Sequence, residues 1–78
     1  MPARTAQHRP KDPWLRALGQ NVRQQRKAAN LTQEKLAELA DLSPRTVQKI
    51  EAGRLNILVT TLRRIKSGIG CGYQDLLG

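Results

Sequence analysis

The sequence contains a single cysteine, Cys71, so the chain cannot form a disulfide within itself. Nothing therefore points to an oxidising compartment. No apolar run approaches the roughly 20 residues that a membrane-spanning helix needs. The charged N-terminal residues are not followed by the apolar segment of a secretory signal. These absences favour a cytoplasmic protein with no membrane partner.

Metal ligands and catalytic groups are equally scarce. His8 is the only histidine, and no Cys/His cluster could hold zinc. Gly68, Gly70 and Gly72 alternate, but they follow a helical pattern rather than a strand, so they lack the context of a dinucleotide-binding loop. We therefore expect no metal, no cofactor and no enzymatic activity.

Acidic residues are few, with 6 Asp and Glu against 14 Lys and Arg, which gives a formal net charge of +8. Such an excess suggests a polyanionic partner, namely DNA, RNA or an anionic membrane surface. Charge alone does not choose among these, because basic domains can simply be soluble. A chain of 78 residues fits one small domain with a modest core.

The first twelve residues differ in composition from the rest. Residues 1–12, MPARTAQHRPKD, hold two prolines and three basic residues, and Met1 is their only large apolar residue. We interpret them as a basic N-terminal arm without a core of its own, either a simple tail or a functional arm. Residues 13–78 are predicted to form the domain.

The first predicted helix begins at Pro13, with Asp12 as its N-cap, and ends near Asn30, which tolerates a left-handed conformation. Its apolar residues recur at helical spacing. These are Leu15, Leu18 and Val22, with Trp14 beside them.

Two short helices follow in the stretch LTQEKLAELADLSPRTVQKIEAG, residues 31–53. Thr32 and Ser43 are the expected N-caps, and Gly53 closes the second helix. Only Asp41 and Leu42 are free to turn between the helices, so their axes must cross steeply. The residues predicted to face the core are Leu36, Leu39, Ala40, Val47 and Ile50.

A fourth helix is predicted from an apolar stripe, and a last short turn, GYQDLLG, follows it. The stripe consists of Val59, Leu62, Ile65 and Ile69, and the helix should end at Gly68 or Gly70. No segment shows the alternation of a strand. The fold class is therefore predicted to be all-α.

This pattern resembles the Cro/C1-type helix-turn-helix family of phage repressors, Cro proteins and small controller proteins of restriction–modification operons. The resemblance covers about residues 14–78 and extends into LVTTLRRIKSGIGCGYQDLL. It implies a compact five-helix, lambda-repressor-like domain. The residues that match the family pattern are Gln33, Ala37, Val47, Ile50, Glu51 and Gly53.

Two positions depart from the family pattern. The turn residue that is usually glycine is Asp41, which can visit the left-handed region at some cost. The first residue of the third helix, often a base-reading glutamine in phage repressors, is Pro44. It has no side-chain donor for a base edge, so a phage operator code does not transfer directly.

The resemblance implies a sequence-specific regulator of transcription that places a recognition helix, about residues 43–52, in the major groove of double-stranded DNA. Arg45 and Lys49 are four residues apart and share a face, and either can donate to guanine. An ordinary solvated helix face is the alternative. The predicted base-reading residues are Arg45, Thr46, Gln48 and Lys49.

Phosphate contacts should frame the groove, because helix N-termini offer free N–H groups and partial positive charge. The family also implies an ion pair between Arg26 and Glu51 that orients the recognition helix, and Gln33 resembles a residue that bonds a phosphate and braces this helix. The predicted phosphate contacts are Thr32, Gln33, Ser43, Arg54, Asn56 and Arg26.

The C-terminal residues Tyr73, Leu76 and Leu77 are predicted to form a homodimer interface, unless the leucines only complete the core. Two other uses of the fold remain open. One is a module for protein interaction, or an antitoxin-like autoregulator that also binds a toxin. The other is sequence-neutral binding of nucleic acid.

Overall fold

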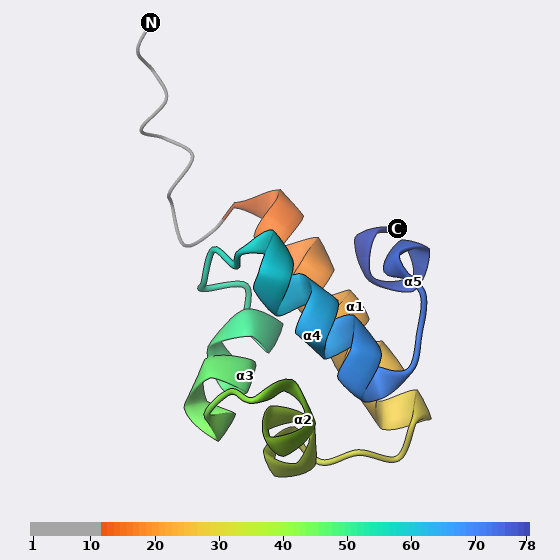
Figure 1. The fold of residues 1–78 in the computed structure, drawn as a ribbon. Coiled ribbons are helices and arrows are strands. Elements are labelled where there is room, and N and C mark those ends of the chain that lie inside the picture. Colours follow the sequence, from red (N-terminus) through yellow and green to blue (C-terminus); the bar gives the residue numbers. More distant parts are fainter. Residues whose placement is uncertain (1–11) are drawn as a thin grey trace, which may run out of the picture.

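The computed structural model describes residues 12–78, and all regular structure in that range is helical. The helices are α1 (Pro13–Ala28), α2 (Gln33–Ala40), α3 (Pro44–Glu51), α4 (Val59–Ile69) and α5 (Tyr73–Leu77) (Figure 1). The predicted all-α fold with five helices is confirmed. Apart from Asp12, the predicted N-terminal arm lies outside the described residues, and so does His8.

The first three helices begin where the sequence predicts, because each is preceded by a side chain that caps it. Asp12 Oδ1 accepts a hydrogen bond from the N–H of Trp14 at 2.8 Å. In the same way, Thr32 Oγ1 accepts from the N–H of Lys35 at 2.9 Å, and Ser43 Oγ accepts from the N–H of Thr46 at 3.1 Å. Asn30, with φ 59°, lies in the left-handed region just after α1, as expected.

The core is formed by apolar side chains from all five helices, which confirms most of the predicted stripes. Removing each larger side chain from water contributes about 1.5–3 kcal/mol. The buried apolar residues are Val22, Leu36, Ala37, Ala40, Val47, Ile50, Leu62, Ile65 and Leu76.

Three apolar residues that the sequence grouped with these stripes are exposed instead. Trp14 and Val59 are 81% and 77% exposed, because they lie in the first turns of α1 and α4 and extend beyond the core. Leu39 is 48% exposed. It follows the stripe of α2 but lies at the rim, where a Cβ added at Gly68 would be 3.2 Å from its own Cβ.

The helices pack in a way that leaves α3 and α5 on opposite sides of the molecule (Figure 1). Helix α1 packs against α3 and α5, and α2 packs against α3 and α4. The approach of α1 to α3 is very close, since a Cβ added at Gly19 would lie 2.3 Å from the carbonyl oxygen of Ile50. No helix in residues 12–78 combines the length and apolarity that crossing a membrane requires.

Candidate nucleic-acid interface

Helix α3 has one buried face and one exposed polar face. Val47 and Ile50 are buried, whereas Arg45, Gln48 and Lys49 are exposed on the other side. With Ala52 and Arg54, these three residues line one shallow depression. The structure therefore brings three of the four predicted base-reading residues together with one predicted phosphate contact.

The exposed cations of this surface are available to a ligand. Within residues 12–78, the side chains of Arg45, Lys49 and Arg54 make no hydrogen bond or ion pair. Long basic side chains that end in water can donate to base edges and phosphate oxygens without first breaking an internal contact. The surface thus has the donor chemistry of a polyanion-binding site.

Thr46 differs from the other three predicted readers. It is half-buried, and its Oγ1 lies 2.9 Å from the capping Oγ of Ser43. Its hydroxyl therefore helps to organise the start of α3, while its methyl group remains a possible apolar contact for a thymine.

The ion pair expected between α1 and α3 is present. Arg26 Nε donates to Glu51 Oε2 at 2.6 Å, and Nη2 donates to Oε1 at 3.1 Å. The Gln33 side chain of α2 donates through Nε2 to the same Oε1, also at 3.1 Å. One carboxylate at the end of α3 therefore ties three helices together, and the predicted bracing role of Gln33 is confirmed.

The phosphate contact predicted for Arg26 stays a prediction, and the structure gives this side chain partners inside the protein. The residue is only 8% exposed. Its Nη1 donates to the carbonyl oxygen of Leu31 at 2.8 Å, in addition to the two bonds to Glu51. The guanidinium is thus committed inside the protein, where it orients α3.

The remaining predicted phosphate contacts lie at helix starts or in the loop after α3. Thr32 and Ser43 are N-caps whose side-chain oxygens accept from the N–H groups of Lys35 and Thr46. Pro44 has no N–H, so the N–H groups of Gln33, Glu34 and Arg45 are the first-turn donors left for a phosphate. Arg54 and Asn56 are exposed in the loop before α4.

The C-terminal prediction is corrected at one position. Leu76 is fully buried, because α5 packs on α1 and Asn21 Nδ2 donates to the Leu76 carbonyl at 2.8 Å. It belongs to the core and not to a dimer interface. Tyr73 and Leu77 are 41% and 59% exposed.

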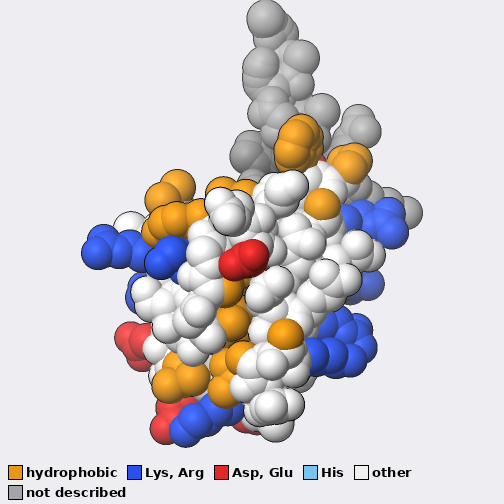
Figure 2. Space-filling model, turned by 90° about the vertical axis from the view of Figure 1, so that its right-hand side faces the viewer, with side chains coloured by type: hydrophobic (Ala, Val, Ile, Leu, Met, Phe, Trp, Pro, Cys, Tyr) orange, Lys and Arg blue, Asp and Glu red, His pale blue; other side chains and the backbone are white. Residues whose placement is uncertain are grey.

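The face that carries α5 has its basic side chains at the edges. Figure 2 shows it from the right-hand side of Figure 1, with Lys and Arg side chains along both edges, and with polar, backbone and hydrophobic groups and an acidic side chain toward the middle. Lys66 Nζ lies 5.0 Å from the centroid of the Tyr73 ring, at cation–π distance.

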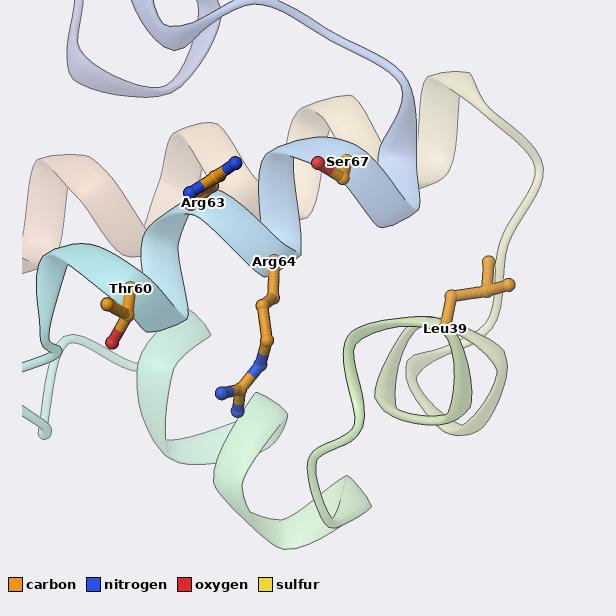
Figure 3. A pocket seen from close by; sticks show the side chains of 5 residues that line it. All are labelled: Leu39, Thr60, Arg63, Arg64 and Ser67. Atoms are coloured by element: carbon orange, nitrogen blue, oxygen red, sulfur yellow. The ribbon is translucent and has the colours of Figure 1, made fainter.

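One residue near the interface was missed by the sequence analysis. Arg64 of α4 donates through Nε to the carbonyl oxygen of Ala40 at 2.9 Å, at the end of α2 (Figure 3). Sequence reasoning assigned only the apolar residues of α4. The available signal was Asp41, which stands where the family usually has glycine, because a left-handed turn without glycine needs stabilising contacts from another part of the chain.

The described residues contain no cluster of three or more His, Cys, Asp or Glu side chains that could hold a metal ion. Burial raises the pKa of the Cys71 thiol above its usual value, and the Asp75 carboxylate adds to this effect. The thiol therefore stays protonated at neutral pH and is a poor nucleophile.

Comparison with known proteins identifies the same architecture. A family model described as helix-turn-helix, HTH_3, matches residues 22–76. The control protein C.BamHI of Bacillus amyloliquefaciens is 38% identical over 60 residues, which are 76% of this chain and 74% of that protein.

Two solved structures share the fold. The restriction–modification controller protein C.AhdI from Aeromonas hydrophila has a TM-score of 0.77 and 29% identity, over 80% of this chain and 94% of that one. The clp gene regulator ClgR from C. glutamicum has a TM-score of 0.78 and 28% identity, over 82% of this chain and 83% of that one.

Proposed function

Because this chain belongs to the helix-turn-helix family, we propose that it regulates transcription by binding a specific sequence of double-stranded DNA through the exposed face of α3. The family places the chain among DNA-binding regulators and not among enzymes, as the sequence analysis expected. The major groove is wide enough to accept a helix, and α3 follows α2 in the arrangement that such proteins insert there.

One observation carries this proposal. Helix α3 exposes the side chains of Arg45, Gln48 and Lys49, for which the described residues provide no hydrogen-bond partner, while its other face is buried and its last residue is fixed by Arg26. A helix held this firmly presents its donors in a defined direction, which direct reading of base edges requires. A merely solvated helix face would not need the buried ion pair behind it.

We propose a division of labour on this surface. Arg45, Gln48 and Lys49 read bases, and Thr46 contributes at most its methyl group. Arg54, Asn56 and the N-termini of α2 and α3 bind phosphates and so fix the register of the protein on the duplex. This division assigns sequence preference and salt dependence to different residues.

We also propose that the protein acts as a homodimer through Tyr73 and Leu77. Both side chains are exposed on α5, and a self-complementary apolar contact suits a two-fold interface. The α5 face lies away from α3 (Figure 1). Two copies could thus present their α3 helices to half-sites one DNA turn apart, ~34 Å.

The operator sequence, and not the fold, determines which genes such a regulator controls. Two of the relatives are named control or controller proteins, whereas ClgR is named a regulator of clp genes. Regulation is the property that these names share. An autoregulator that controls its own operon is one form of this proposal, and an operator in its own upstream DNA would support it.

The test is selection of bound sequences from a random pool of duplex DNA at a fixed, stated salt concentration. Sequence-specific regulation predicts one enriched motif, and a homodimer predicts that the motif is palindromic. Binding to the motif should persist in an excess of competitor DNA. If DNA is recovered but no motif is enriched, the protein binds nucleic acid without sequence preference. If no DNA is recovered, the remaining hypothesis is a module for protein interaction.

A further inference from the structure

The end of α2 is capped by a side chain from another helix. The last carbonyl groups of a helix have no partners within it. At the end of α2, Leu42 N–H donates to Ala37 O at 2.8 Å and Asp41 N–H donates to Glu38 O at 3.3 Å. The carbonyl of Ala40 accepts instead from Nε of Arg64, at 2.9 Å, and Arg64 Nη2 lies 3.5 Å from the Asp41 carbonyl.

This cap is placed where the backbone is under strain. Asp41 has φ 57° and ψ 50°, a left-handed conformation that favours glycine. The last turn of α2 contains no basic residue that could interact with its carbonyl end. The guanidinium of Arg64 therefore supplies, from α4, both the donor and the positive charge that a helix C-terminus favours.

The location matters because residues 41–43 alone connect α2 to α3. A connection this short transmits any change in the backbone of Asp41 to the direction of α3. We propose that Arg64 is a positioning residue for DNA recognition, which holds the α2–α3 turn in its left-handed form and so sets the angle of α3. This inference rests on the proposed function, since it assigns a role to that same helix.

Arg63 offers a matched control. It neighbours Arg64 and lines the same surface depression, together with Leu39, Thr60 and Ser67. In Figure 3 Arg64 reaches toward the segment that joins α2 and α3, whereas Arg63 points away from it. The Arg63 side chain makes no hydrogen bond or ion pair within the described part of the chain. Removing either residue changes the net charge equally, but only one change removes the cap.

The first experiment measures the turn without DNA. Amide hydrogen exchange is followed at Leu42 in the wild type, Arg64→Ala, Arg63→Ala and Asp41→Gly combined with Arg64→Ala. Exchange at Ile65, in the core, corrects for global unfolding. Arg64→Ala should speed exchange at Leu42 about tenfold relative to Ile65, a loss typical of one hydrogen bond from a charged group. Arg63→Ala should not, and Asp41→Gly should restore most of the protection.

The second experiment measures recognition with the same proteins. The readout is the ratio of affinity for the selected motif to affinity for unrelated DNA, at several salt concentrations. Arg64→Ala should lower this ratio about tenfold with an unchanged salt slope on unrelated DNA. Glycine at position 41 should restore it, because the turn then needs less support. A purely structural role would not move the ratio among molecules that remain folded.

Three results would overturn the inference. The first is that Arg64→Ala leaves the exchange rate at Leu42 unchanged. The second is that Arg64→Ala lowers the affinity for both DNAs equally and reduces the salt slope. The third is that Arg63→Ala and Arg64→Ala give the same results in both experiments. The second result would identify Arg64 as a phosphate ligand. If the wild type has no preferred sequence, the proposed function fails, but hydrogen exchange still tests the cap by itself.

Discussion

Arg26 of α1 and Glu51 of α3 meet in a buried, two-pronged ion pair, with Nε 2.6 Å from Oε2 and Nη2 3.1 Å from Oε1. The pair joins residues 25 positions apart in the sequence. Because Gln33 shares the same carboxylate, the pair fixes the end of the recognition helix relative to both α1 and α2.

Breaking this pair from one side should be costly. Arg26→Ala or Glu51→Ala would leave a buried charge without its partner and should lower the free energy of unfolding by about 3–5 kcal/mol. Replacing both residues, as Arg26→Met with Glu51→Leu, should cost less than either single change, since no charge remains buried. Urea unfolding measures all three variants, and strictly additive losses would contradict this account.

Gly19→Ala tests the close contact between α1 and α3. Alanine normally stabilises a helix interior by about 1 kcal/mol relative to glycine. Here the new Cβ would lie 2.3 Å from the Ile50 carbonyl oxygen, so the helices must separate and the variant should lose about 1–3 kcal/mol. Gln20→Ala, on the exposed neighbouring position, is the control. Equal thermal midpoints for Gly19→Ala and the wild type would refute the close approach.

The base-reading assignment predicts a change in preference. Arg45→Ala should cost about 1–3 kcal/mol on the selected motif and relax the preference at one base pair, and Lys49→Ala should do so at a neighbouring pair. Repeating the selection with each variant measures this directly. If both variants keep the wild-type preference at every position, α3 is not the reader.

The phosphate assignment predicts a change in salt dependence. Each phosphate that is neutralised on duplex DNA contributes about 0.9 to the slope of log affinity against log salt. Arg54→Ala should therefore reduce the slope by roughly 1 and leave the sequence preference intact. Arg45→Ala is the comparison, because its preference should change. An unaltered slope removes Arg54 from the phosphate contacts.

The dimer proposal is tested with Leu77→Glu. A carboxylate placed in an apolar two-fold interface would be brought close to its symmetry mate, so the variant should sediment as a monomer and lose affinity for a palindromic motif, while its helicity is unchanged. Leu39→Glu changes another exposed leucine, on α2, and should remain dimeric. A wild-type protein that stays monomeric at high concentration would dispose of the dimer altogether.

Local signals in the sequence were sufficient for most of the fold. Asp12, Thr32 and Ser43 cap their helices through contacts with residues two or three positions away, so their roles can be read from spacing. The left-handed conformation of Asp41 was expected from the family resemblance, because this turn position is usually glycine. The resemblance to a known family supplied the ion pair of Arg26 with Glu51.

Features that depend on three-dimensional packing could not be predicted in this way. Periodicity places Val59 on the same stripe as Leu62, but it does not show that the core ends before the first turn of α4. Likewise, Leu76 and Leu77 are equivalent as sequence, and only the docking of α5 on α1 decides which is buried. The bond from Arg64 to Ala40 spans 24 positions and joins two helices whose crossing the sequence does not give.

The exposed face of α3 shares none of its hydrogen bonds with the supports behind it. The side chains of Arg45, Gln48 and Lys49 contribute nothing to the core or to the described hydrogen-bond network, whereas those of Val47, Ile50 and Glu51 hold the helix in place. If α3 reads bases as proposed, a substitution on this face can change the preferred DNA sequence while the scaffold remains intact. Such a protein can acquire a new operator through single substitutions on this face that cost no folding stability. Sequence specificity can therefore change between related proteins much faster than the fold does.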